Sequence, residues 1–249
     1  MQRAITNEGR RRTLDEIMGA LDEWVSRHGN GQYEQGDRMP MEGLMIPDDA
    51  GIQQDRREIE AFVSTLLSRD RLGSVLEVGL GYFGSTHFLW RLLFDHVTTI
   101  EKSPERIRTF GTNLRNFSGH WVLDDHRSGF VIGMSDDPPT VRKAYQHLAG
   151  GIDLLFVDGD HQYASVLTDW LLYSPLVRAA GLVAFHDVGL TLPGHSEVPA
   201  FLEDLSRGAV DGRPRTLQTI RHTPYLGIAF YEQHQVDVDE TEGGRDGIS

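Results

Sequence analysis

The chain has 249 residues, 39% of them hydrophobic, which is enough for one large α/β domain with an added arm. Its formal net charge of −13 disfavours binding to nucleic acids and to anionic membranes, because both present negative charge. The chain has no cysteine, which excludes disulfide scaffolds, thiolate zinc sites and a cysteine nucleophile. No signal peptide and no membrane-spanning run is recognisable, so we expect a cytoplasmic protein.

Two helices are predicted near the N-terminus. The first covers 13–28, where apolar residues follow one stripe and Thr13 and Glu16 have the spacing of a capping box. The second covers 55–68. Between them, residues 29–51 contain Gly, Pro, Met and Asp without a period, and an irregular segment of this length is typical of a lid or a binding loop.

From residue 74 onward, strand-like apolar runs alternate with helical runs. Strands are predicted at 74–80, 96–101, 120–124, 152–158 and 181–187, and helices at 85–94, 103–117, 141–149, 163–177 and 198–208. Apolar strands separated by helices indicate an α/β fold with a parallel sheet covered on both faces. Two further strand-like runs, at 215–222 and 225–232, predict a hairpin.

These patterns divide the chain into three parts. Residues 1–70 form an N-terminal helical arm and lid, and residues 71–235 form the core. The remaining segment, 236–249, is acidic and rich in glycine, and we expect it to be disordered.

A glycine motif, Gly79-x-Gly81-x-x-Gly84, lies between the first core strand and the next helix. Glycine lets the backbone turn tightly and approach a ligand closely, and this context satisfies the condition for a nucleotide-binding loop. Glu101 lies 20 residues beyond Gly81, at the end of the next strand. There its carboxylate can accept hydrogen bonds from two ribose hydroxyls.

Two cofactors fit such a loop, a dinucleotide and S-adenosylmethionine (SAM). Glu77 lies two residues before the first glycine of the motif. Its negative charge is unfavourable beside a pyrophosphate, but it suits a ligand with a cationic amino-acid end. The sequence therefore favours SAM over NAD, with a tight turn that binds no ligand as the remaining alternative.

Ionisable residues follow two of the predicted strands. Asp158, Asp160 and His161 follow one, and His186 and Asp187 follow the other. In open α/β sheets, ligands bind outside the carboxyl ends of the strands. Neighbouring carboxylates repel each other, and a divalent cation would relieve this repulsion, with Asp158 and Asp187 as ligands suited to Mg²⁺ or Mn²⁺. His186 is predicted as a third ligand, with a supporting or stacking role as the alternative.

His161 is the predicted general base, because the ordinary pKa of histidine lies near working pH. The alternative is a histidine that caps the next helix. Asp160 has three roles open to it, which are to bind the metal, to orient His161 or to cap that helix.

The motifs LEVGLGYFGST, FVDGDHQY and FHDV together resemble the class I SAM-dependent methyltransferases. They are most similar to metal-dependent O-methyltransferases of natural-product pathways, including macrolide sugar O-methyltransferases, the cephalosporin-hydroxylase-like group and calicheamicin-type rhamnose O-methyltransferases. The resemblance runs from about Val75 to Glu232. It implies a Rossmann-like, seven-stranded, mostly parallel sheet with helices on both faces and a C-terminal hairpin that places one antiparallel strand. It also implies that 71–235 is a SAM-binding core.

The resemblance also implies roles for individual residues. Asp158 and an acidic pair after the fifth strand would hold the metal, and His161 would act as the base. This chain departs from the pattern at one position, where His186 precedes Asp187. The residues implied in cofactor binding are Glu77, Gly79, Gly81, Ser85, Glu101 (at the ribose) and Asp125 (near the adenine).

The sequence thus predicts methyl transfer from SAM to a hydroxyl of a sugar, which is free, nucleotide-activated or attached to a natural product. A catechol-type phenolic O-methyltransferase, an NAD-dependent oxidoreductase and a non-catalytic subunit with this fold are the alternatives. The expected partners are a small-molecule acceptor and a second copy of the chain, with no nucleic acid and no membrane.

Overall fold

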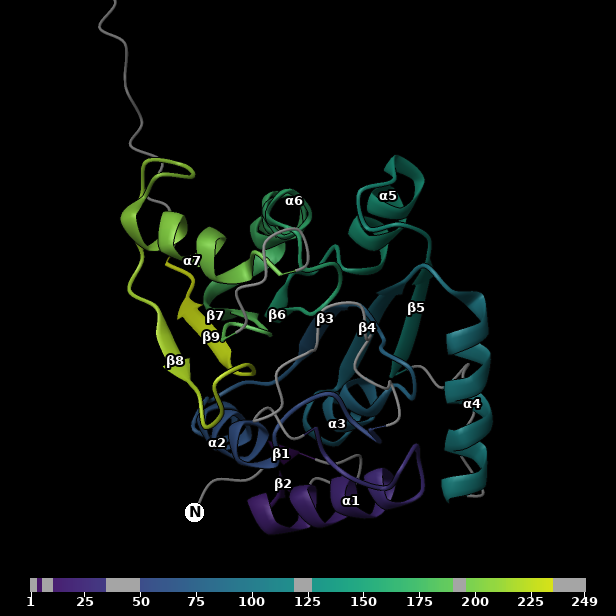
Figure 1. Ribbon diagram of the computed structural model, residues 1–249. Helices are drawn as coiled ribbons and strands as arrows, with labels where there is room; N and C mark the ends of the chain where they lie inside the picture. Colours follow the sequence, from purple (N-terminus) through teal and green to yellow (C-terminus); the bar gives the residue numbers. More distant parts are fainter. Residues whose placement is uncertain (1–3, 6–10, 35–49, 119–126, 190–195, 235–249) are drawn as a thin grey trace, which may run out of the picture.

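A seven-stranded sheet forms the centre of the computed structural model (Figure 1), which describes residues 4–5, 11–34, 50–118, 127–189 and 196–234. The strands lie in the order β5-β4-β3-β6-β7-β9-β8. Their bounds are β3 (Ser74–Val78), β4 (His96–Glu101), β5 (Ser128–Ile132), β6 (Ile152–Val157), β7 (Val177–Phe185), β8 (Gln218–Ile220) and β9 (Ile228–Glu232). A separate two-stranded ribbon pairs β1 (Ala4–Ile5) with β2 (Arg11–Arg12).

The strands from β5 to β7 in this order run parallel to one another. The next strand, β9, runs antiparallel to both of its neighbours, β7 and β8. This arrangement confirms the predicted Rossmann-like sheet, including its C-terminal hairpin and its single antiparallel strand.

Helices cover both faces of the sheet (Figure 1). One face carries α1 (Leu14–Ser26), α2 (Arg56–Leu67), α3 (Ser85–Leu93) and α4 (Pro104–Ser118), and the other carries α5 (Pro138–His147), α6 (Tyr163–Tyr173) and α7 (Val198–Arg207). A 3₁₀ turn, Ser174–Leu176, follows α6. Alternate strand residues supply the two cores, since Phe156 packs in the first and Leu155 in the second.

The two N-terminal helices pack on the first face of the sheet. The predicted capping box of α1 is confirmed, because Glu16 N donates to Thr13 Oγ1 at 3.2 Å and Thr13 N donates to Glu16 Oε2 at 2.8 Å. The Trp24 ring of α1 stacks on Phe88 of α3 at 4.4 Å. This aromatic contact fixes α1 against α3.

A short β-bridge joins the chain that follows α1 to the chain that precedes α2. Tyr33 pairs with Ile52, Glu34 N donates to Ile52 O at 3.0 Å, and Gly51 N donates to Gln32 O at 2.9 Å. These bonds hold together the two ends of the segment 35–49. That segment includes most of the predicted lid, and it lies outside the described residues together with the predicted tail.

The strand beside β4 lies at a position that the sequence prediction did not assign. The predicted range 120–124 lies outside the described residues, and the strand that pairs with β4 is β5, which the sequence prediction left unassigned. Only Val131 of β5 is buried, so its apolar pattern is weak. The register pairs Glu101 with Ile132, so the chain that leaves β5 emerges beside Glu101.

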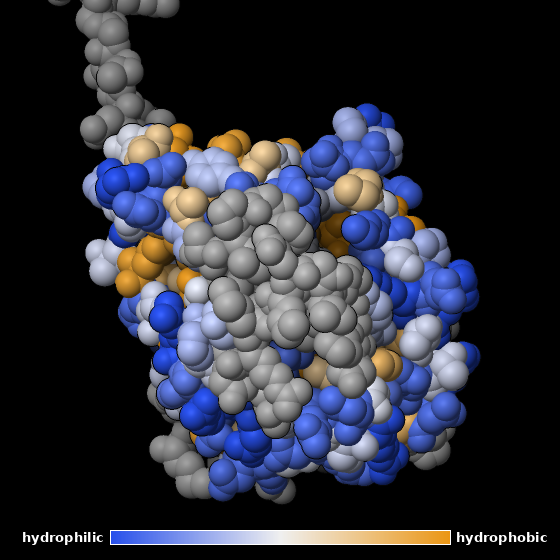
Figure 2. Space-filling model, in the orientation of Figure 1, coloured by the Kyte–Doolittle hydropathy of each residue, from blue (hydrophilic) through white to orange (hydrophobic). Residues whose placement is uncertain are grey.

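Hydrophilic residues cover most of the described surface in the view of Figure 2, in agreement with the net charge of −13. None of the helices within the described ranges combines the length and the apolar character that crossing a membrane requires.

Candidate active site

The glycine motif forms a tight turn between β3 and α3. Gly79 has a φ of +94°, and a Cβ atom added to it would lie 2.2 Å from the carbonyl oxygen of Asp158. Gly81 and Gly84 also have positive φ angles, +66° each. Because only glycine fits at position 79, the loop packs directly against the chain that carries Asp158.

Glu101 connects the glycine loop to the end of β4. Its Oε2 accepts a hydrogen bond from Leu80 N at 3.0 Å, and its Oε1 accepts one from Ser103 N at 2.7 Å. The carboxylate thus lies at the carboxyl edge of the sheet, beside the glycine loop, as the predicted ribose contact requires. The contact itself stays a prediction.

Glu77 lies in the interior, beneath the glycine loop. Trp90 Nε1 donates to its Oε1 at 3.0 Å, and Thr99 Oγ1 donates to its Oε2 at 2.5 Å. Complete burial raises the pKa of Glu77 to about 8, although hydrogen bonds from Thr86 and Thr99 oppose this shift. Both carboxyl oxygens therefore have partners inside the protein, and the predicted contact with the cationic end of SAM stays a prediction.

This burial predicts how stability varies with pH. The pKa of Glu77 is higher in the folded than in the unfolded chain, so its contribution is complete below its ordinary pKa of 4.5 and is lost as pH rises towards about 8. We expect Glu77→Gln to remove about 2 kcal/mol of the fall in unfolding free energy between about pH 5.5 and 7.5. Urea unfolding of both proteins at several pH values measures this difference. Parallel pH profiles would contradict the expectation.

Two further residues, Ser85 and Asp125, are predicted to bind the cofactor. Ser85 begins α3, and its hydroxyl accepts from Trp24 Nε1 at 2.9 Å and donates to Gly51 O at 2.5 Å. Asp125 lies outside the described residues. Both cofactor contacts stay predictions.

Sequence reasoning missed an apolar surface beside Glu101. Ile132 and Met134 lie at the end of β5 with 49% and 54% of their surface exposed, and Gly133 N donates to the Glu101 carbonyl oxygen at 3.1 Å. The sequence prediction missed this surface because it did not assign a strand to 128–132.

Asp158, His161 and Asp187 converge at the carboxyl ends of β6 and β7. Each offers one atom in a set whose members all lie within 4.8 Å of one another. His161 Nε2 is 3.1 Å from Asp187 Oδ2 and 3.9 Å from Asp158 Oδ1. The structure therefore brings the predicted base and two predicted ligands into one cluster. Asp160 lies apart from this set and accepts from Ser165 Oγ at 2.7 Å, at the start of α6.

His186 lies behind this cluster. Only 2% of its surface is exposed, and its Nδ1 is 3.3 Å from Asp158 Oδ1 and 3.4 Å from Asp187 Oδ1. Its Nε2 is 3.0 Å from Oε1 of Glu58, a fully buried residue of α2. The imidazole thus joins the N-terminal arm to both carboxylates.

The arm supplies two residues that sequence reasoning missed, Glu58 and Gln54. Gln54 Nε2 donates to Asp158 Oδ2 at 2.8 Å. Glu58 shares a four-residue spacing with Phe62 and Leu66 of the buried stripe, and an acid in such a stripe was the available signal. Gln54 gave no comparable signal, because it precedes the helix.

The carboxylates and imidazoles of the cluster shift one another's pKa values towards their charged forms. Burial would raise the pKa of Asp158, but the positive charge of His186 and the hydrogen bond with His161 outweigh it and hold this pKa below its ordinary value. Burial would lower the pKa of both histidines, but Asp158 and Asp187 raise them, that of His186 most. The cluster therefore keeps an anionic carboxylate beside two basic imidazoles.

The donor set fits a divalent cation. Two carboxylates and two imidazoles face one another, and nearby buried oxygens, Gln54 Oε1 and Glu58 Oε2, have no hydrogen-bond partner among the described residues. Oxygen ligands suit Mg²⁺ and Mn²⁺, and imidazole nitrogen shifts the preference towards transition metals.

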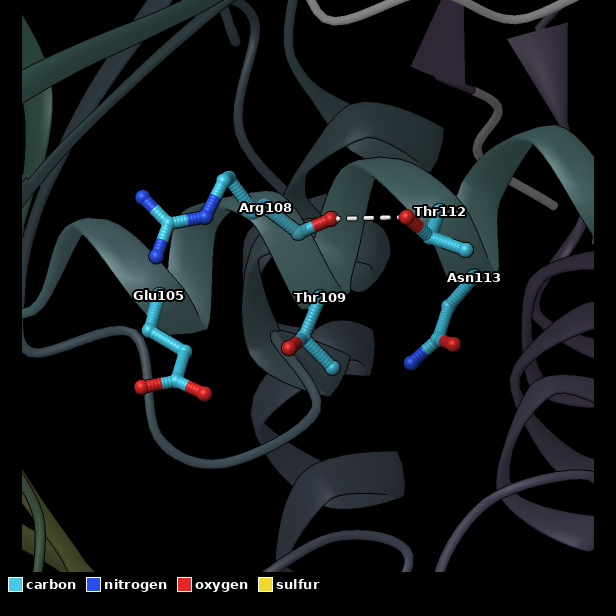
Figure 3. Close-up of a pocket in the computed structure, with 5 residues that line it drawn as sticks. All are labelled: Glu105, Arg108, Thr109, Thr112 and Asn113. Carbon is cyan, nitrogen blue, oxygen red and sulfur yellow. Dashed lines mark hydrogen bonds between the residues drawn. The ribbon is translucent and has the colours of Figure 1, made fainter.

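A shallow hollow of about 280 Å³ lies along the outer surface of α4 (Figure 3). It is lined by Glu105, Arg108, Thr109, Thr112 and Asn113. One helix supplies all five residues, and Thr112 Oγ1 already donates to the Arg108 carbonyl oxygen at 3.0 Å. We therefore assign no role to this hollow.

Residues 76–188 match the family model Methyltransf_24, described as a methyltransferase domain. The match begins in β3, ends just after β7, and includes the glycine motif, Glu101 and the cluster at Asp158. A curated relative, the uncharacterized protein R132 of Acanthamoeba polyphaga mimivirus, is 50% identical over 40 residues, which are 16% of this chain. The match spans 18% of that relative.

Two solved structures show the same fold. The O-methyltransferase from Bacillus cereus in complex with SAH aligns with a TM-score of 0.50 and 15% identity, over 88% of this chain and 90% of that one. An rRNA methylase from Streptococcus thermophilus aligns with a TM-score of 0.51 and 12% identity, over 77% of this chain and 100% of that one. The chain therefore has the Rossmann-like methyltransferase fold. Together with the domain match, this fold supports a SAM-dependent methyltransferase, the class that the sequence predicted.

Proposed function

We propose that the protein is a SAM-dependent O-methyltransferase that transfers a methyl group to a hydroxyl of a small molecule with the help of a divalent metal. One observation carries the proposal. The cluster of Asp158, His161 and Asp187 lies at the sheet edge directly against the glycine loop, where a Cβ atom on Gly79 would lie 2.2 Å from the Asp158 carbonyl oxygen. A methyl donor in the loop and an acceptor at the cluster would therefore be neighbours.

Burial distinguishes the roles of the two histidines. The His161 side chain is 33% exposed, so its Nε2 can reach an acceptor hydroxyl, whereas His186 is too deeply buried to do so. His161 Nε2 lies 3.1 Å from Asp187 Oδ2, and with Asp187 engaged by the metal this nitrogen would be free to take the hydroxyl proton, while the oxygen attacks the sulfonium methyl carbon and the bond from carbon to sulfur breaks.

Asp158, Asp187 and Nδ1 of His186 would hold the metal. The bound metal would supply positive charge that lowers the pKa of the acceptor hydroxyl. The Asp158 carboxylate is prepared for this role, since its depressed pKa keeps it anionic. Gln54 fixes the second oxygen of this carboxylate at 2.8 Å and so sets its orientation.

We further propose a sugar hydroxyl as the acceptor. Support comes from the resemblance carried by LEVGLGYFGST, FVDGDHQY and FHDV, and from the weak nucleophilicity of secondary sugar hydroxyls, which explains a base and a metal together. The fold itself does not select the acceptor, since one similar structure is named an rRNA methylase. The net charge of −13 disfavours an RNA acceptor here. A catechol acceptor is the second candidate.

Mass spectrometry of reactions with SAM and Mg²⁺ tests this proposal. Free and nucleotide-activated deoxysugars form one acceptor panel and catechols form another. We expect a mass gain of one CH₂ unit on a sugar. Transfer to catechols alone would favour the phenolic alternative, and binding of NAD without binding of SAM would overturn the methyltransferase proposal.

Metal removal gives a further expected result. Treatment with a chelator should lower the rate about 10-fold or more, because the acceptor hydroxyl would then keep its high pKa. Mg²⁺ or Mn²⁺ should restore the rate, while SAM affinity measured by calorimetry should change little. An unchanged rate in the chelated enzyme would contradict metal assistance.

A further inference from the structure

Glu58 is a buried acid that the mechanism above leaves without a role. It lies on α2, outside the matched segment 76–188. Its Oε1 is 3.0 Å from His186 Nε2 and accepts a second hydrogen bond from Asp55 N at 3.2 Å. Its Oε2 is buried and has no hydrogen-bond partner among the described residues.

This contact places a hydrogen on Nε2 of His186 and so fixes which nitrogen faces the cluster. A carboxylate only accepts hydrogen bonds, so the contact at 3.0 Å requires a hydrogen on Nε2. The other nitrogen, Nδ1, faces both Asp158 and Asp187, at 3.3 and 3.4 Å. A carboxylate that binds one imidazole nitrogen and leaves the other for a metal is a frequent arrangement around metal-binding histidines.

We propose that Glu58 is a positioning residue that holds Nε2–H of His186 and thereby directs Nδ1 at Asp158 and Asp187, where it would serve as a nitrogen ligand when a metal takes the place of its proton. The inference rests on the metal site of the proposed function. It makes the N-terminal arm a part of that site, although the arm precedes the methyltransferase domain.

A purely structural role for Glu58 predicts a different result. Glu58 also completes the capping box of α2 with Asp55. Glutamine serves equally well at that position of a capping box, so Glu58→Gln keeps the cap. The glutamine amide can also donate to Nε2, which releases the imidazole from one fixed hydrogen position. Glu58→Gln therefore separates control of the imidazole from capping of the helix.

The experiment compares Glu58→Gln with Glu60→Gln in the full chain. Glu60 is a matched control, because it lies on the same helix, is partly exposed and pairs with Arg56 at 2.7 Å. Calorimetry measures the affinities for Co²⁺ and Mg²⁺, and thermal unfolding without metal reports the fold. We expect Glu58→Gln to weaken Co²⁺ binding about 10-fold or more, and Mg²⁺ binding less, because imidazole nitrogen favours Co²⁺ over Mg²⁺. Glu60→Gln should change neither affinity.

An equal loss for both metals, or no loss, would overturn the inference. A second measurement uses His186→Asn, in which Glu58→Gln should cause no further loss of Co²⁺ affinity. Additive losses would mean that Glu58 does not act through His186. Should Glu58→Gln fail to fold, Glu58→Asp takes its place. Its shorter carboxylate should lose the contact with Nε2 of His186 and weaken Co²⁺ binding more than Mg²⁺ binding, and unchanged affinities would overturn the inference.

The same data separate the two proposals. If the unchanged protein binds neither metal, metal assistance and the role of Glu58 fail together, while methyl transfer is still decided by the acceptor panels. If it binds both metals and Glu58→Gln matches it, only the role of Glu58 fails.

Discussion

Replacing His161 with alanine is expected to lower kcat by about 10²–10⁴-fold, the usual contribution of a general base. The side chain is the exposed imidazole of the cluster, and its Nε2 lies 3.1 Å from Asp187 Oδ2. Initial rates at saturating SAM and acceptor measure the change. A fully active His161→Ala enzyme would overturn the assignment of the base.

Two controls distinguish a base from a metal ligand. Metal affinity should survive His161→Ala if the imidazole is the base, and should fall together with kcat if it is a ligand, because His161 belongs to the set that could hold the ion. His234→Ala should leave kcat unchanged, because His234 is exposed and follows the last strand of the sheet.

Gly79→Ala is expected to lower the unfolding free energy by about 2–4 kcal/mol and to abolish SAM binding. A methyl group here combines a positive φ of +94° with a contact 2.2 Å from the Asp158 carbonyl oxygen, so strain and overpacking add. The loop and the end of β6 must then separate, and both border the proposed cofactor site. Urea unfolding and SAM calorimetry measure the two effects.

Gly81→Ala is the matched control. Its φ of +66° is also strained for alanine, but a Cβ atom there would come no closer than 3.7 Å to Gln53 Oε1. We expect a loss of only about 1 kcal/mol from backbone strain. Equal losses in the two variants would show that the close approach to Asp158 does not determine the effect.

Much of the fold could be predicted because its signals are local. The capping box of α1 needs only Thr13 and Glu16, and the glycine motif marks the turn between a strand and a helix. The convergence of Asp158 and Asp187 followed from the rule that parallel strands end at one edge of a sheet.

The features that were missed depend on weak or distant signals. β5 begins with Ser128 and Gly129, and only Val131 is buried, so its apolar pattern is weaker than that of the run at 120–124. Glu58 and His186 are separated by 128 positions in the chain, and no local pattern pairs them. The contacts on the buried side of the site could therefore be identified only from the structure.

The bridge between Tyr33 and Ile52 has a consequence for how this architecture can diversify. Because the chain is fastened at that crossing, the length of the intervening stretch can vary at a small cost in loop-closure entropy. Gln54 lies only two residues beyond it and holds Asp158. We therefore expect changes in the length of that stretch to leave the hydrogen bond between Gln54 and Asp158 in place.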